Sequence, residues 1–221
     1  MLRLALCCIG AAVLAIPIGA QAGAQIYEPM AASVRAGLAA SIADNPPPRH
    51  GFSDSSDAVD WLTEMSRRLD RRIPDYRVRL DFLRTLHYEA TRADLDPQLV
   101  LAIIQVESNF RKYAVSSAGA RGFMQVMPFW VSLIGRRADN LFDLRINMRF
   151  GCVILRHYLE VEKGNLPRAL AKYNGSLGKS GYPDLVFRAL RANWQYDRQP
   201  RKAQSAGYLI NPQATRLRLQ S

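Results

Sequence analysis

Glu107 is the residue of this chain best suited to acid–base chemistry. It follows the apolar run 99–104, and Asp96 and Pro97 before that run provide a cap and a first residue for a helix. Apolar side chains lie four and seven residues before Glu107, so its carboxyl group is expected on or beside the apolar stripe of that helix. Burial disfavours the charged form of a carboxyl group and so suits it to donate a proton near neutral pH. The simpler interpretation of an isolated Glu is a side chain that ends a helix and reaches water.

Ordered blocks of residues around and after Glu107 favour the first interpretation. The blocks are Glu107-Ser108-Asn109-Phe110, Ala114-Val115-Ser116, Gly119-Ala120-Arg121-Gly122-Phe123-Met124-Gln125-Val126-Met127-Pro128, Asn140-Leu141-Phe142-Asp143, Asn147 with Gly151, and Tyr173-Asn174-Gly175. Over roughly residues 80–195 they resemble the catalytic domain of the soluble-type lytic transglycosylases (family 1, SLT domain). That family cleaves the glycan strands of bacterial peptidoglycan on a lysozyme-like fold. The resemblance implies a mostly α, lysozyme-like single catalytic domain.

The resemblance also implies the residues of the site. Glu107 would be the catalytic residue, and the substrate-binding or orienting residues would be Ser116, Gln125, Met127, Tyr173 and Asn174. Ser116 and Gln125 would hydrogen-bond the acid or the sugar. Met127 would pack against a sugar ring, and Tyr173 would lie close to Glu107 and help to place it. Outside this context, a Met or a Tyr at such a position would be interpreted as a core residue.

One carboxyl group is sufficient for the reaction that the resemblance implies. Most glycosidases pair two carboxylates, but the nearest acidic residues offer no obvious partner, since Asp96 and Asp143 are expected to cap helices. Glu107 would protonate the oxygen of the MurNAc–GlcNAc β-1,4 bond, and the acetamido group would stabilise the cation. Glu107 would then take the proton of the muramic 6-hydroxyl, which closes on C1 to give 1,6-anhydro-MurNAc. No cofactor is expected, and the separated His50, His87 and His157 do not indicate a metal site.

Two other functions remain open from the sequence. A goose-type lysozyme hydrolase would keep the fold but add water to the same bond. A peptidoglycan-binding or secretion-assembly protein would use the domain mainly for binding. The presence of Glu107 together with its matching neighbours favours catalysis.

The elements that must position these residues are predicted to be helices throughout. We expect helices at about 30–42, 55–69, 74–90, 97–107, 144–162, 167–174 and 183–194, together with a short helix through Met124. The helix at 144–162 is apolar nearly all round, which is typical of a central buried helix and places Cys152 in the core. No stretch alternates as a strand does, and no repeat is found.

The two ends of the chain are expected to lie outside the catalytic domain. Residues 1–24 read as a signal peptide, because Arg3 precedes an apolar run and small residues at 20–24 offer a cleavage site. An uncleaved anchor is the alternative, although Pro17 and Gly19 shorten the run. We expect a lead-in or linker at 25–55, the catalytic domain at 56–199 and a basic, disordered tail at 200–221.

The charge of the chain indicates its partners. The formal net charge is +11, and residues 198–221 carry five basic side chains and no acidic one. A basic exported protein suits anionic polymers such as peptidoglycan glycan strands, whereas the export signal argues against nucleic acid. From the export signal we expect a protein of the periplasm or cell envelope of a Gram-negative bacterium, with no stable membrane insertion after signal removal. We also expect it to be a monomer. Envelope-spanning machinery is a possible further partner.

Overall fold

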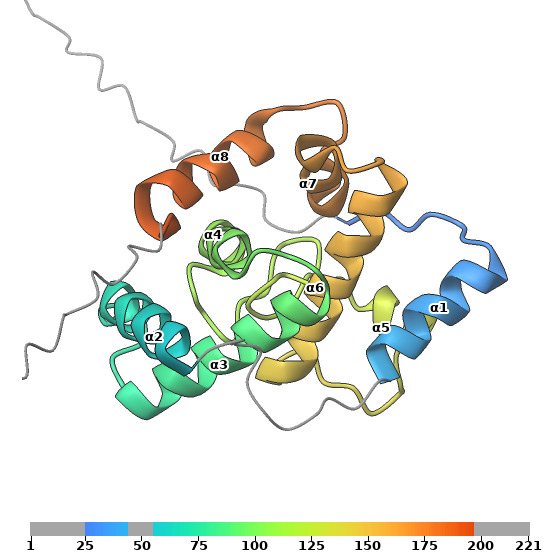
Figure 1. The fold of residues 1–221 in the computed structure, drawn as a ribbon. Helices are drawn as coiled ribbons and strands as arrows, with labels where there is room; N and C mark the ends of the chain where they lie inside the picture. Colours follow the sequence, from blue (N-terminus) through green and yellow to red (C-terminus); the bar gives the residue numbers. More distant parts are fainter. Residues whose placement is uncertain (1–24, 44–54, 197–221) are drawn as a thin grey trace, which may run out of the picture.

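The computed structural model describes residues 25–43 and 55–196, and these ranges are predominantly helical (Figure 1). The elements are α1 (Ala32–Ala43), α2 (Ser55–Leu69), α3 (Tyr76–Arg92), α4 (Pro97–Ser108), α5 (Phe129–Ile134), α6 (Leu144–Val161), α7 (Leu166–Asn174), α8 (Gly181–Ala189) and the π-helical turn η1 (Leu190–Trp194). Within these ranges, β pairing is confined to isolated bridges that join Val115 to Arg121 and Arg121 to Val126. The predicted mostly α class is confirmed.

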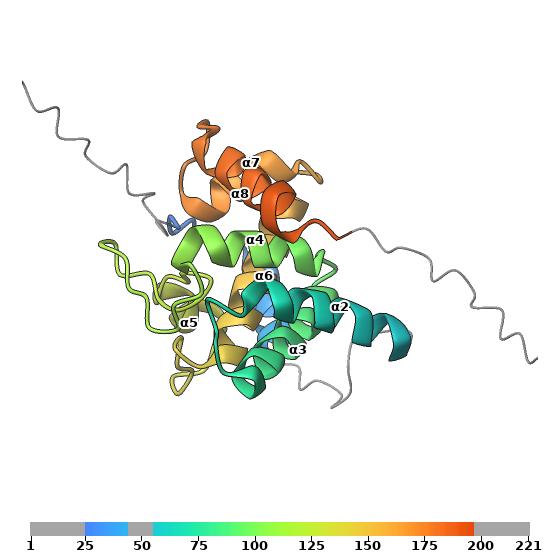
Figure 2. The same ribbon diagram turned by 90° about the vertical axis from the view of Figure 1, so that its left-hand side faces the viewer.

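Helix α4 lies at the centre of the molecule. Figure 2 shows α7 and α8 on one side of it and α2 and α3 on the other. Every residue from Leu99 to Ile104 is buried, so this short helix is apolar on all sides, as expected of an element enclosed by others. The Asp96 side chain accepts a hydrogen bond from the N–H of Gln98 at 2.8 Å, and Pro97 occupies the first turn. Asn109, in the left-handed conformation, ends the helix directly after Ser108.

Helix α6 forms the second buried axis. The Asp143 carboxylate caps it, accepting hydrogen bonds from the N–H groups of Arg145 and Ile146 at 3.0 Å each. Cys152 on this helix is buried and free, as predicted. Helices α3 and α7 both pack on α6. The sequence therefore specified both caps locally, because each side chain bonds a backbone group only two or three residues away.

A buried ion pair joins three of the helices. Glu89 on α3 is buried, and its carboxylate accepts hydrogen bonds from Arg149 on α6 at 2.9 and 3.2 Å. Arg149 also donates to the backbone carbonyl of Ile42 in α1 at 3.2 Å. A buried carboxylate is tolerated when charged donors satisfy it in this way. The contact fixes α3, α6 and α1 relative to one another.

Residues 25–43, which the sequence suggested were a lead-in, pack against the helical core. Helix α1 contacts α5 and α6, and Ile42 joins the buried apolar core. The predicted signal peptide and basic tail lie outside the described residues. The chain's expected division into segments therefore remains a prediction.

The predicted short helix through Met124 is wrong. Residues 122–125 form turns, and the short helix begins only at Phe129. Positive φ angles at Gly119, Gly122 and Gln125 (87°, 76° and 48°) are incompatible with a continuous right-handed helix. The apolar spacing at 123–127 resembled a helical pattern, but these side chains pack into the core from a loop.

Candidate active site

Glu107 lies in the last turn of α4 and is only 4% exposed. The hydroxyl of Tyr182 donates a hydrogen bond of 2.6 Å to its Oε1 atom. Within the described residues, the other carboxyl oxygen, Oε2, is buried and has no hydrogen-bond partner. Burial raises the pKa of Glu107 to about 8, and the hydrogen bond from Tyr182 opposes part of that rise. The carboxyl group is therefore mostly protonated at neutral pH.

The sequence analysis missed Tyr182. This residue lies in the first turn of α8, which packs against α4, and its ring is buried. It is 75 residues from Glu107 in sequence, so no local pattern connected the two. The available signal was an aromatic residue directly before Pro183 at the start of an amphipathic helix.

Tyr173 lies near Glu107, but its hydroxyl bonds another group. The side chain is fully buried in the last turn of α7 and donates a 2.7 Å hydrogen bond to the carbonyl of Met124. Burial first, and then the charge of Glu107, raise the pKa of Tyr173 well above its ordinary value. Its neighbour Asn174 is also buried, just before Gly175 ends the helix. The hydrogen bond to the Glu107 carboxyl group comes from Tyr182, and a role of Tyr173 in placing Glu107 remains a prediction.

Gln125 and Ser116 brace the loop that follows Glu107. The Gln125 amide is buried and donates to the carbonyls of Ala114 at 3.1 Å and Gly122 at 2.8 Å. The Ser116 hydroxyl accepts a 3.1 Å hydrogen bond from the N–H of Ala120. Met127, at the far end of the loop, is half-buried against the core. The predicted contacts of these residues with a sugar remain predictions.

Asn147 anchors this loop to α6. Its side chain is fully buried and makes three hydrogen bonds: it accepts from the N–H of Met124 at 2.8 Å and donates to the carbonyls of Arg121 and Leu141 at 2.9 and 2.8 Å. A Cβ atom on Gly122 would lie 2.4 Å from the Asn147 amide nitrogen. The loop backbone therefore lies against Asn147 with no space for a side chain.

A second close contact sets the depth of the same loop. A Cβ atom on Gly151 of α6 would lie 2.4 Å from the sulfur of Met124. On the other side, the Ser108 hydroxyl donates a 2.8 Å hydrogen bond to the carbonyl of Phe123. The loop is thus fixed between α6 and the end of α4, directly beside Glu107.

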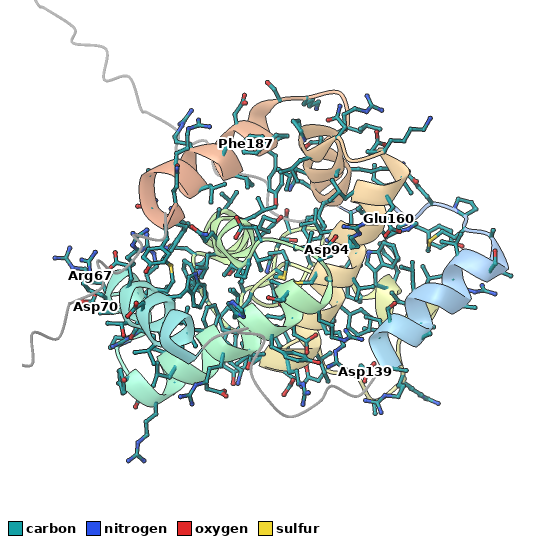
Figure 3. All side chains as sticks on the ribbon, viewed as in Figure 1. Arg67, Asp70, Asp94, Asp139, Glu160 and Phe187 are labelled. Atoms are coloured by element: carbon teal, nitrogen blue, oxygen red, sulfur yellow. The ribbon has the colours of Figure 1, made fainter. Side chains whose placement is uncertain are left out.

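The acidic residues nearest to Glu107 in sequence are engaged elsewhere. Asp96 and Asp143 cap helices, as described above. Asp94 pairs with Arg156 at 2.7 Å, and Asp139 accepts from the N–H of Arg136 at 2.8 Å. Figure 3 shows Asp139 near the lower edge of the molecule, away from α4. Among the described residues, no group of three or more His, Cys, Asp or Glu side chains is arranged to hold a metal ion.

The comparison with protein families gives a match over the whole of this site. Residues 85–182 match the family described as Transglycosylase SLT domain. Residues 85–182 thus have the sequence pattern of a transglycosylase SLT domain, and this range is called the SLT domain below. The SLT domain begins within α3 and extends to Tyr182, so it includes Glu107, the loop, Asn147, Tyr173 and Asn174. The resemblance expected from the sequence is confirmed.

Known proteins are similar to the SLT domain over parts of their length. A transglycosylase of Enterobacteria phage PRD1 is 30% identical over 103 residues, which cover 47% of this chain and 38% of the phage protein. Membrane-bound lytic murein transglycosylase C of Actinobacillus pleuropneumoniae is 54% identical over 39 residues, which cover 18% of this chain and 11% of that protein. The structure of an inactive mutant of lytic transglycosylase Slt from Pseudomonas aeruginosa also matches, with 27% sequence identity and a TM-score of 0.41. The matched region covers 55% of this chain and 22% of the Slt chain. This chain thus spans well under half the length of these relatives.

The described helices were also compared with the requirements of a membrane-spanning helix. Within the described ranges, none of them combines the length and the apolar character that a membrane-spanning segment requires.

Proposed function

We propose that this protein is a peptidoglycan lytic transglycosylase that cleaves the MurNAc–GlcNAc β-1,4 bond and forms 1,6-anhydro-MurNAc. The observation that carries the proposal is a buried Glu107 with a pKa of about 8 inside an SLT domain. A general acid works best when its pKa lies near the working pH. Among the described residues, burial and the Tyr182 hydrogen bond set this pKa, with no contribution from a charged group.

The first step is proton donation by Glu107. Because Tyr182 donates to Oε1, that oxygen is engaged as an acceptor and the acidic proton is carried on Oε2. Oε2 then protonates the glycosidic oxygen as the bond between C1 of MurNAc and that oxygen breaks. The GlcNAc part leaves as an alcohol, and the acetamido group of MurNAc stabilises the positive charge at C1.

The second step returns the proton to the enzyme. Glu107, now a carboxylate, removes the proton of the muramic 6-hydroxyl, whose oxygen bonds to C1 and closes the anhydro ring. Burial favours this step, because the desolvated carboxylate regains its neutral form. The engagement of Asp94, Asp96, Asp139 and Asp143 elsewhere supports a mechanism with one acid.

The neighbouring residues bind and orient the substrate in this proposal. The five are Ser116, Gln125, Met127, Tyr173 and Asn174. We further propose that the protein is exported to the cell envelope, where it meets peptidoglycan, and that residues 1–24 are its signal peptide. Its basic charge suits an anionic wall polymer. Service to an envelope-spanning machine would be a specialisation of the same activity.

Product analysis on purified sacculi tests the proposal. Digestion should release muropeptides that end in 1,6-anhydromuramic acid, which borohydride does not reduce and which are one water lighter than lysozyme products. Reducing ends in their place would assign the protein as a goose-type hydrolase. Binding to sacculi with no released product would instead favour a peptidoglycan-binding or secretion-assembly protein.

A further inference from the structure

Gln25 reaches the active site from far away in the sequence. Its side chain is only 3% exposed, although the four residues that follow it are exposed. Its Oε1 atom accepts a 3.1 Å hydrogen bond from the N–H of Met127, and its Nε2 atom donates to the carbonyl of Gln125 at 3.4 Å. It also makes a side-chain hydrogen bond with Tyr173. Gln25 therefore contacts three of the residues proposed to bind substrate.

In this contact the side-chain amide of Gln25 bonds two backbone groups of the loop. The carbonyl of Gln125 and the N–H of Met127 present one acceptor and one donor, and the Gln25 carboxamide satisfies both. An N-acetyl group on a sugar also carries one N–H donor and one carbonyl acceptor. Each of these two backbone groups can therefore bind the acetamido group of an N-acetylated sugar, through its carbonyl or its N–H, and Gln25 would compete for the same hydrogen bond.

Residues 26–29, between Gln25 and the half-buried Met30, are exposed and contact α5 and α7. The Tyr27 ring lies edge-on to Phe129 of α5 with centroids 5.8 Å apart, and Glu28 pairs with Lys172 of α7 at 3.2 Å. Tyr27 and Glu28 are exposed, whereas the Lys172 side chain is only 15% exposed. In Figure 1 this stretch, coloured blue before α1, passes the lower end of α7 and the upper end of α6. Gln25 is thus a buried side chain at the start of a short exposed stretch that precedes α1.

We propose that Gln25 occupies the place of a sugar acetamido group and must leave when an N-acetylated glycan binds. This inference rests on the proposed function, because it assigns the glycan as the competing ligand. The segment is then a built-in competitor of the substrate. If it is docked about nine-tenths of the time, it weakens the apparent affinity for glycan about tenfold.

The test compares Gln25→Ala with the intact protein. The probe is the tetramer of N-acetylglucosamine, and the measurement is its dissociation constant by calorimetry. We expect the variant to bind the tetramer about 3- to 10-fold more tightly. On sacculi, KM should fall by the same factor and kcat should stay unchanged, because competition affects binding alone.

Two further variants serve as checks. Gln25→Glu cannot donate to the Gln125 carbonyl, so it should behave as Gln25→Ala does. Ile26→Ala changes an adjacent side chain that is 60% exposed, and it should leave the dissociation constant unaltered. The fully deacetylated glucosamine tetramer should gain no affinity in any variant.

Opposite results would overturn the inference. Unchanged or weaker binding of the acetylated tetramer by both Gln25 variants would make Gln25 a brace of the loop rather than a competitor. An equal gain for the deacetylated tetramer would remove the acetamido group from the argument. The proposed function fails separately, when the intact protein releases no anhydro product from sacculi.

Discussion

At the scale of single residues, the burial that suits Glu107 to proton donation also makes the stability of the folded protein depend on pH. In the folded protein its pKa is about 8, whereas the ordinary value is 4.5. Between these two values the unfolded chain binds fewer protons than the folded chain does. The stabilising contribution of the neutral form is therefore complete below about pH 4.5 and is lost as the pH rises through 8, by at most ~1.4 kcal/mol per pH unit.

Glu107→Gln separates the catalytic effect from the effect on stability. The amide cannot donate and retake a proton, so turnover should fall by about 100-fold or more. The same variant has no carboxyl group to ionise, and it keeps an oxygen that can accept from Tyr182. Its thermal unfolding temperature should therefore exceed that of the wild type by a margin that grows between pH 5 and pH 8. Full activity in this variant would remove Glu107 from the mechanism.

Tyr182 should set the pH dependence of the reaction. Activity is expected to fall as the pH rises above about 8, because the protonated acid is depleted. Tyr182→Phe removes the hydrogen bond that lowers the pKa of Glu107, so the alkaline limb should move to higher pH. The loss of orientation should also reduce kcat about 10- to 100-fold. The measurement is a pair of profiles against pH, one of kcat/KM, which reports the pKa of the free protein, and one of kcat.

Tyr76→Phe is the control for this substitution. Its ring is 59% exposed on α3, so the same chemical change should leave both the limb and kcat in place. An unmoved alkaline limb in Tyr182→Phe would show that another group controls the profile.

At the scale of elements, the sequence was informative where interactions are local. The caps of α4 and α6 were predicted because Asp96 and Asp143 bond backbone groups two or three residues ahead. The contact between Tyr182 and Glu107 could not be predicted, because it depends on how α8 packs against α4. The turn at Met124 was missed because its glycines compete with an apolar pattern that also suits a helix. Most of the helices could thus be predicted, but the hydrogen bonds of the site could not.

Asn147 is expected to control the stability of the loop beside Glu107. Asn147→Ala would leave the N–H of Met124 and two backbone carbonyls without their buried partner. We expect a loss of about 2–4 kcal/mol in the free energy of unfolding, measured by urea denaturation. Activity should fall as well, since the loop carries Gln125 and Met127.

Asn140→Ala is the matched control for that substitution. The Asn140 side chain accepts a hydrogen bond from the exposed N–H of Phe142. Asn140→Ala should therefore lower the free energy of unfolding by no more than about 1 kcal/mol. Equal losses in the two variants would mean that the buried bonds of Asn147 have no special weight.

At the scale of the whole molecule, charge should govern how the protein meets the wall. The net charge is +11, and the last 24 residues contribute five positive charges without a negative one. Deleting residues 200–221 should weaken binding to sacculi, more strongly at low salt, where attraction between charges is least screened. Turnover of short soluble glycans should remain. If that turnover were lost, the boundary of the catalytic domain would lie further towards the C-terminus than expected.

The pairing of Glu107 with Tyr182 also bears on when the enzyme becomes active during its synthesis. Chains are made from the N-terminus, so Glu107 emerges 75 residues before its partner. Until α8 docks on α4, the carboxyl group lacks both the hydrogen bond from Tyr182 and the cover that α8 provides. A chain that stops before residue 182 therefore lacks the completed acid. Under the proposed function, docking of α8 on α4 is therefore the folding step that completes the acid.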